Sequence, residues 1–139
     1  MKNSAAIRDY AIEQMNRLLT NLAFQIHRTA KSSGPEEIHD LRVSVRRFSQ
    51  GLQVFSSFLP KWQVKKIKRL LKELMQLTSE IRNRDITLEF LTEEDHDEYR
   101  RRLERERASY QRRFSSMVRR WSASDFSVKW RSGLALQPV

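Results

Sequence analysis

The chain has no cysteine, and only three glycines and three prolines among its 139 residues. Without cysteine, disulfides, thiolate metal sites and cysteine nucleophiles are excluded. Glycine and proline supply most tight turns, so a chain with so few of them cannot easily connect many strands. No apolar run approaches the length of a membrane span, and the polar residues 1–4 do not resemble a secretion signal. These absences favour an all-α protein, for which a cytoplasmic location is the default expectation.

Apolar residues at helical spacing predict four long helices and a short fifth one. The four cover about residues 4–31, 35–59, 61–91 and 97–122, and Ser124 and Asp125 are expected to cap the fifth. The tail after Gly133 is expected to fray. With short connections throughout, residues 1–139 are predicted to form a single domain, a four-helix bundle with an additional C-terminal helix.

The predicted core faces differ in how regular they are. The second helix shows alternating steps of four and three, which is typical of a bundle seam. Its apolar positions are Leu41, Val45, Phe48, Leu52, Phe55 and Leu59. The other helices contribute Ile7, Tyr10, Ala11, Leu18, Leu22, Ile26, Val64, Ile67, Leu70, Leu71, Leu74, Leu77, Ile81, Leu88, Leu91, Tyr99, Leu103, Tyr110, Phe114, Met117, Trp121, Phe126, Val128 and Trp130.

Positive charge dominates the remaining surface. The chain has 27 Lys and Arg against 17 Asp and Glu, a formal net charge of +10. Such a surface repels itself, and an anionic partner would offset that cost. Nucleic acid, inorganic polyphosphate and an anionic membrane all qualify, and the alternative is a basic surface that binds nothing.

The second helix carries the most informative cations. His39, Arg42 and Arg46 are separated by three and four residues, so they share one stripe beside the apolar seam. Guanidinium groups match the geometry of phosphate oxygens, which makes a phosphate oxyanion the partner that fits this stripe best. A contact between His39 and phosphate would strengthen binding below about pH 6.5, where histidine becomes cationic.

The third helix supplies a second group of cations. Lys65, Lys66, Lys68, Arg69 and Lys72 lie in its first half, and Arg82 and Arg84 lie further on. Helical angles place Asp85 toward the apolar face, where a carboxylate needs a partner. The hypothesis is that Asp85 pairs with Arg42 or Arg46 and orients that side chain for phosphate.

The run His39-x-x-Arg42-Val43-x-x-Arg46-Arg47, followed by Arg82-x-Arg84-Asp85, resembles the CHAD family, the conserved histidine α-helical domain. The pattern departs from the family at two positions, with Ile81 in place of glycine and Thr87 in place of an acid. The resemblance implies an all-helical protein that binds inorganic polyphosphate. It implicates His39, Arg42, Arg46, Arg47 and Arg84 as ligands of phosphate oxygens, with the lysines of the third helix as supporting contacts. In the predicted groove, Arg42 and Arg46 hold successive phosphates, and Lys65, Lys66, Arg69 and Arg84 act as further cations.

Family domains commonly contain two helical halves that face each other across a basic groove, and this chain has the length of one half. Two arrangements therefore stay open: two copies dimerise and rebuild the groove, or the groove is shallower. A symmetric dimer would bring two identical basic rows together, so polyanion is expected to strengthen it.

The fourth helix contains a run of arginines of mixed character. Glu98, Glu104 and Glu106 alternate with the first of them and predict a solvated lattice of ion pairs. Arg112, Arg113, Arg119 and Arg120 have no acid nearby in the sequence, and whether they extend the anion surface stays open.

Binding of inorganic polyphosphate in a groove between the second and third helices is the leading functional interpretation, with attachment to polyphosphate granules as one consequence. An RNA- or DNA-binding protein that contacts the phosphate backbone is the alternative, although no surface cluster of aromatics for base stacking is evident. Catalysis and a bound metal or cofactor are not expected. Glu93, Glu94, Asp95 and Asp97 cluster, but at a helix junction. A membrane partner is disfavoured because every apolar face is needed for the core.

Overall fold

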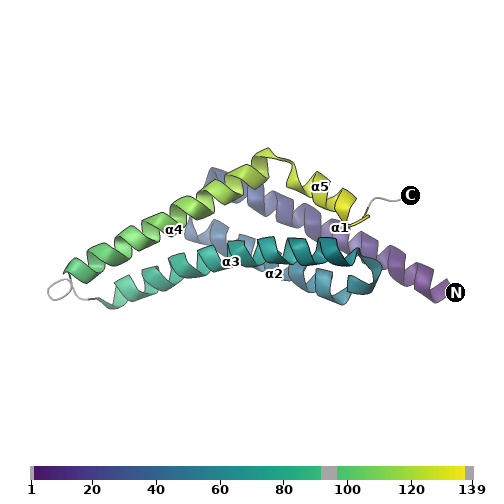
Figure 1. Ribbon diagram of the computed structural model, residues 1–139, viewed down its shortest axis with the longest axis horizontal. Coiled ribbons are helices and arrows are strands. Elements are labelled where there is room, and N and C mark those ends of the chain that lie inside the picture. Colours follow the sequence, from purple (N-terminus) through teal and green to yellow (C-terminus); the bar gives the residue numbers. More distant parts are fainter. Residues whose placement is uncertain (1, 92–96, 137–139) are drawn as a thin grey trace.

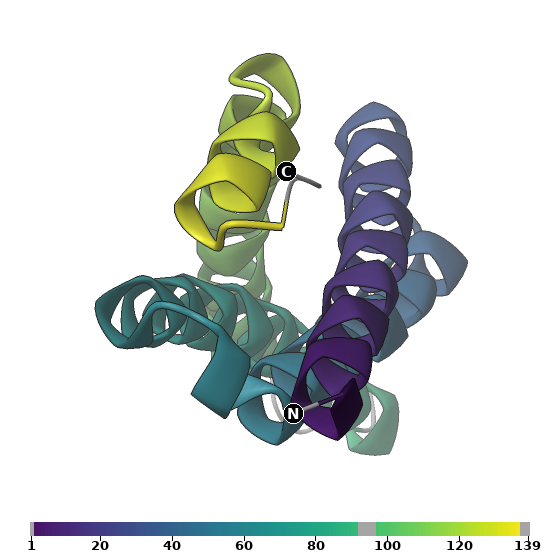
Figure 2. The ribbon, with the colours of Figure 1, turned by 90° about the vertical axis from the view of Figure 1, so that its right-hand side faces the viewer.

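The computed structural model describes the backbone of residues 2–91 and 97–136. Four long helices, α1 (Lys2–Lys31), α2 (Pro35–Val54), α3 (Lys61–Phe90) and α4 (Asp97–Ala123), are followed by the short α5 (Phe126–Gly133). The described residues contain no strand, so the predicted all-α bundle is confirmed. Consecutive helices pack against each other and α4 returns to α1, so that the four surround one interior (Figures 1 and 2).

The α1–α2 connection follows the signals in the sequence. Residues 32–34 separate the two helices, and Pro35 occupies the start of α2, where its missing N–H costs no hydrogen bond. Glu36 and Glu37 follow in the first turn, where the helix dipole favours negative charge. The start of α2, and with it the position of His39 one turn later, is therefore fixed locally.

The second helix ends earlier than its apolar pattern predicts. Helix α2 ends at Val54, and a 3₁₀ turn (Ser56–Phe58) carries the chain to α3. Pro60 precedes the first residue of α3 and cannot continue a helix from before it. The prediction of helix to Leu59 was wrong because Leu59 is buried outside the helix, in extended backbone. The predicted junction at residues 93–96 lies outside the described residues.

The C-terminal segment packs more tightly than expected. Leu134 and Leu136 are fully buried, and the amide of Asn16 donates to the carbonyl oxygen of Leu136 at 2.8 Å. The expectation that the chain frays directly after Gly133 was therefore wrong. Asp125 adopts a left-handed conformation and makes no capping hydrogen bond with its side chain, so the predicted cap of α5 is also absent.

The core consists of aliphatic side chains from all four long helices and an aromatic cluster under α5. Phe48 stacks on Trp130 with ring centroids 6.0 Å apart, and Phe126 and Trp121 pack edge-on or tilted around them. Four residues expected in the core are instead exposed by 45% or more: Ile7, Tyr10, Tyr99 and Val128. Tyr99 and Val128 lie in the first turns of α4 and α5, and Ile7 and Tyr10 in the second and third turns of α1.

Helix α3 is longer than α2, its neighbour at the candidate site. Thirty residues give α3 a length of about 45 Å, against about 30 Å for the 20 residues of α2. The paired ends of α3 and α4 consequently extend past the start of α2 (Figure 1). The N-terminal turns of α2 lie next to this extension, and the candidate site is formed there.

Candidate anion-binding groove

A pocket of about 340 Å³ lies where the first two turns of α2 meet α3 and α4. The stripe predicted on α2 points into it, with His39, Arg42 and Arg46 all on its wall. The complete lining consists of Ser33, Pro35, Ile38, His39, Arg42, Arg46, Thr78, Ile81, Arg82, Asp85 and Arg107. Of the residues that the structure describes, five basic side chains therefore surround the pocket, and Asp85 is the one carboxylate.

Arg42 is the most tightly held of these cations. Its Nη1 donates to the carbonyl oxygen of Met75 and the Oγ of Ser79, each at 3.2 Å, and to the Oγ1 of Thr78. Thr78 is 2% exposed, and its own hydroxyl donates to the same carbonyl oxygen at 2.9 Å. All three acceptors lie on α3, so this hydrogen-bond network fixes the guanidinium across the α2–α3 interface. The acceptors are neutral, and within the described residues Arg42 takes part in no ion pair.

The electrostatic state of Arg42 reflects this arrangement. Burial lowers its pKa, and the positive charges of Arg46 and Arg82 lower it further. A cation whose charged form is disfavoured by burial and by like charges gains most from a nearby anion. The pocket is therefore positioned to stabilise an oxyanion in contact with Arg42, Arg46 and Arg82.

The groove between α2 and α3 continues beyond the pocket. A second hollow of about 540 Å³ is lined by Ser49, Gln50, Gln53, Val54, Lys68, Leu71, Lys72 and Met75. On α2 its lining follows Arg46 at steps of three and four, so both hollows lie along one face of the helix. Lys68 Nζ donates to the Oε1 of Gln53 at 3.0 Å across it. We call the two hollows together the α2/α3 groove.

Asp85 lies in this groove, but with a different partner from the one predicted. Its carboxylate accepts hydrogen bonds from Arg107 of α4, through Nε and, at 3.5 Å, through Nη2. The hypothesis that Asp85 pairs with Arg42 or Arg46 was therefore wrong. Asp85 is also about half exposed rather than buried, because it lies on the extension of α3 that α2 no longer covers.

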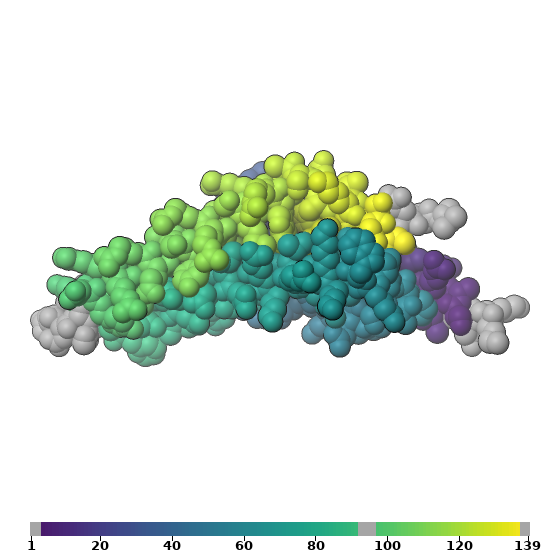
Figure 3. Space-filling view, in the orientation of Figure 1, coloured from purple at the N-terminus to yellow at the C-terminus, as the bar shows by residue number. Residues whose placement is uncertain are grey.

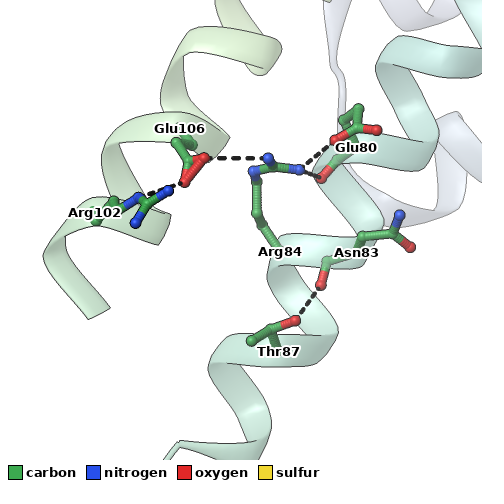
Figure 4. Close-up of polar contacts among 6 residues, drawn as sticks. All are labelled: Glu80, Asn83, Arg84, Thr87, Arg102 and Glu106. Carbon is green, nitrogen blue, oxygen red and sulfur yellow. Dashed lines mark hydrogen bonds and ion pairs between the residues drawn. The ribbon is translucent and has the colours of Figure 1, made fainter. Parts of the chain in front are cut away.

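Arg84 points to the other side of α3. Its guanidinium pairs with Glu80 at 2.5 Å and with Glu106 at 3.2 Å, and Arg102 approaches the second oxygen of Glu106 at 3.6 Å (Figure 4). Hydrogen bonds to both carboxylates raise the pKa of Arg84 against the effect of burial. The structure thus places Arg84 in a network of ion pairs outside the groove, and its role as a phosphate ligand stays a prediction.

The lysines of α3 divide between its two sides. Lys68 and Lys72 line the α2/α3 groove, whereas Lys66 lies over the ring of Trp62, with Nζ 5.8 Å from the centroid. Lys65, Lys66 and Arg69 are exposed but line neither hollow, and the same holds for Arg47 on α2. The structure thus brings together His39, Arg42 and Arg46 of the predicted set, together with Asp85.

Sequence reasoning gave no role in the groove to Arg107 or Arg82, and it treated Lys68 and Lys72 only as members of the group of supporting lysines on the third helix. A signal for Arg107 was present, because α3 and α4 are antiparallel neighbours with their expected junction at about residues 93–97. Residues at equal distances from that junction face each other, which places Asp85 opposite Arg107. The flank of α3 that faces α2 could not be chosen in the same way, so Lys68 and Lys72 were not distinguished from their neighbours.

No group of three or more potential metal ligands occurs within residues 2–91 and 97–136. Among these described residues, no helix is long and apolar enough to cross a membrane. The groove has guanidinium, ammonium and imidazole groups as its main polar features.

The fold and the site define this protein as a helical bundle with a basic groove between α2 and α3. The sequence model of the CHAD domain matches residues 11–138, nearly the whole chain. The protein therefore belongs to the CHAD family, in agreement with the resemblance of its His39–Arg47 and Arg82–Asp85 segments. Neither a curated protein nor a solved structure gives a significant match.

Proposed function

We propose that this protein is a binding module for inorganic polyphosphate, which it holds along the α2/α3 groove. The supporting observation is the charge of the lining. Six Arg or Lys side chains and His39 surround the two hollows, against Asp85 as the single carboxylate. A linear chain of phosphates offers closely spaced oxyanions to such a row, and membership of the CHAD family agrees with this ligand.

The contacts are proposed to differ in kind along the groove. Arg42, fixed by three acceptors on α3, is a rigid donor that loses little side-chain freedom when an oxyanion arrives. Arg46 and Arg82 are exposed and add guanidinium forks around it, and Lys68 and Lys72 continue the row as point charges. Affinity is expected to rise with chain length until the groove is filled and to fall with salt.

Nucleic acid is the second candidate because its backbone carries the same oxyanions. The lining of the two hollows includes no aromatic side chain on which a base could stack. Sequence-independent contact with a phosphodiester backbone would still be possible electrostatically. Polyphosphate carries its charges closer together and has no bases to accommodate, so it is the preferred ligand.

A competition titration tests this proposal. Labelled long-chain polyphosphate is bound at near-physiological salt and displaced with single-stranded RNA at matched phosphate concentration. The double variant Arg42→Ala/Arg46→Ala is expected to lose most of the affinity. The control Arg8→Ala/Arg17→Ala removes two exposed charges from α1 and is expected to bind nearly as the wild type does. Equal displacement by RNA, or full binding by the groove variant, would contradict the proposed ligand or site.

The module is proposed to hold its ligand without cleaving it. Hydrolysis of phosphoanhydrides usually relies on carboxylates that converge on a metal ion. The described part of the groove offers Asp85, already paired with Arg107. Incubation with polyphosphate and added Mg²⁺ or Mn²⁺ is expected to release no inorganic phosphate, and time-dependent release would assign a catalytic role instead.

A further inference from the structure

A third hollow, separate from the two of the α2/α3 groove, lies in the seam that α3 forms with α4. Its volume is about 300 Å³, and its polar lining consists of Arg112, Arg113, Ser116 and Arg120 of α4 with Glu73 of α3. Figure 3 shows the face on which α3 and α4 lie next to each other. Three guanidinium groups therefore face one carboxylate, outside the α2/α3 groove.

The two basic surfaces are separated by the body of α3. At about 100° per residue, Glu73 points roughly 160–180° away from Leu71, Met75 and Arg82, which line the α2/α3 groove. Leu77 and Ile81, about 40° apart on α3, lie at the border between the two hollows. A single straight polyanion in one groove therefore cannot also occupy the other. The α3/α4 seam is a separate surface rather than the edge of the first one.

The arginines of this seam are not compensated by acids. Across the described residues they take part in no ion pair, whereas Arg102 and Arg107, earlier in α4, pair with Glu106 and Asp85. After Glu106 the sequence contains no acid until Asp125. The distal half of α4 thus carries excess positive charge that ion pairing within the described chain does not neutralise.

Two of these arginines are held in position. The guanidinium of Arg113 lies 5.5 Å from the ring centroid of Tyr110, whose ring is also covered by Arg84 at 4.6 Å. Arg120 Nε donates to the carbonyl oxygen of Ser116 at 3.4 Å. Such contacts reduce the freedom that a long side chain loses on binding an anion. They distinguish the seam from a surface of freely moving arginines.

The stripe of α3 that contributes to this seam extends its charge. Lys66 and Arg69 precede Glu73 at steps of three and four, so they share its side of the helix. Both are exposed and do not line the α2/α3 groove. The basic side of α3 and α4 therefore continues beyond the hollow toward the start of α3.

We propose that the α3/α4 seam is a second binding site for condensed phosphate, so that one protein molecule bridges two polyphosphate chains or two distant stretches of one chain. This inference rests on the proposed function of the α2/α3 groove. It adds a consequence that a single groove does not have. The protein would cross-link and condense long polyphosphate, rather than only coat it.

The number of sites tests the proposal directly. Isothermal titration with a short polyphosphate, too short to pass from one groove to the other, is expected to give two sites per wild-type chain. Arg112→Ala/Arg113→Ala/Arg120→Ala is expected to retain one site, and so is Arg42→Ala/Arg46→Ala. The control Arg8→Ala/Arg17→Ala/Lys31→Ala removes three exposed charges from α1 and is expected to retain both sites.

Light scattering with long-chain polyphosphate tests the cross-linking. Wild type and control are expected to condense the chains, whereas the α4 triple variant binds them without condensing them. If the wild type binds short polyphosphate at only one site, and the Arg42→Ala/Arg46→Ala variant loses that site, the proposed second site is wrong. The proposed function of the α2/α3 groove would then still hold. Condensation by the triple variant would also overturn the second site, and would point to dimers that pair two α2/α3 grooves. A wild-type chain without affinity for polyphosphate would remove both proposals.

Discussion

Asp85 of α3 and Arg107 of α4 form an ion pair at the mouth of the pocket that holds Arg42. Among the described residues it is the only carboxylate in the lining, and its partner is one of the five basic side chains there. An incoming oxyanion would meet both the attraction of Arg107 and the repulsion of Asp85. The pair is more than one third exposed on both sides, so its own contribution to stability is small, roughly 1 kcal/mol or less.

Replacement of Asp85 by asparagine is therefore expected to strengthen binding. The substitution removes the repulsive charge and frees Arg107 for phosphate, and we expect a gain in polyphosphate affinity of about two- to fivefold. Fluorescence anisotropy with labelled polyphosphate measures it. Asp9→Asn, which removes an exposed acid from α1, is the matched control and should change affinity little. Weaker binding of Asp85→Asn would instead mean that the carboxylate orients Arg107 for the ligand.

The two arginines of the α2 stripe are expected to respond differently to removal. Arg42→Ala removes the hydrogen bonds to the carbonyl oxygen of Met75, to Thr78 and to Ser79, so it should lower the free energy of unfolding by about 1–3 kcal/mol. Arg46 is exposed and makes no such bonds within the described residues, so Arg46→Ala should change stability by about 0.5 kcal/mol or less. Urea unfolding without ligand measures both variants. Both should lose affinity for polyphosphate, and equal stabilities would show that the network around Arg42 contributes little.

Much of the fold could be predicted from the sequence because helical periodicity and scarce turn residues dominate it. The start of α2 at Pro35 and the stripe of His39, Arg42 and Arg46 followed from local rules alone. The ends of helices followed less well. Leu59 continues the apolar pattern of α2, but its backbone is extended and it lies outside the helix. Apolar periodicity indicates which side chains are buried and does not by itself give the backbone conformation.

The remaining errors concern how helices are placed around each other. A helical pattern gives the core face of α3 but not which flank faces α2 and which faces α4. Lys68 and Lys72 therefore could not be separated from Lys66 before the bundle was known. Likewise, the partner of Asp85 depends on the register of the α3–α4 pair. The prediction assigned an arginine of α2 to Asp85, whereas α4 supplies Arg107.

The imidazole of His39 provides a test by pH. It lies in the pocket with Arg42 and Arg46, where a protonated imidazole would add a further cation. If that cation contacts phosphate, affinity should rise by a few fold as the pH falls from about 8 to 5.5. The rise should shrink in His39→Asn. Because His27 and His96 are unchanged in that variant, the difference between the two pH profiles isolates His39. Identical profiles would exclude it from the electrostatic contacts.

Salt is expected to act in opposite directions on stability and on binding. In the free protein, the charges of Arg46 and Arg82 repel that of Arg42, within a chain of net charge +10, and this repulsion lowers the stability of the fold. Chloride salts screen that repulsion, so thermal unfolding should shift upward by a few degrees between low and physiological ionic strength. Arg46→Ala/Arg82→Ala, which leaves Arg42 without these like-charged neighbours, should show a smaller shift.

Binding should weaken over the same range of salt, because each phosphate contact releases condensed counterions. Six Arg and Lys contacts in the α2/α3 groove predict a slope of roughly −4 for log affinity against log salt, on the scale of a single-stranded polyanion. Loss of Arg42 and Arg46 should reduce the slope by roughly 1.4. Chloride is used because sulfate or phosphate would itself occupy the groove. An affinity that is independent of salt would show that the charges of the groove do not hold the ligand, whatever their effect on stability.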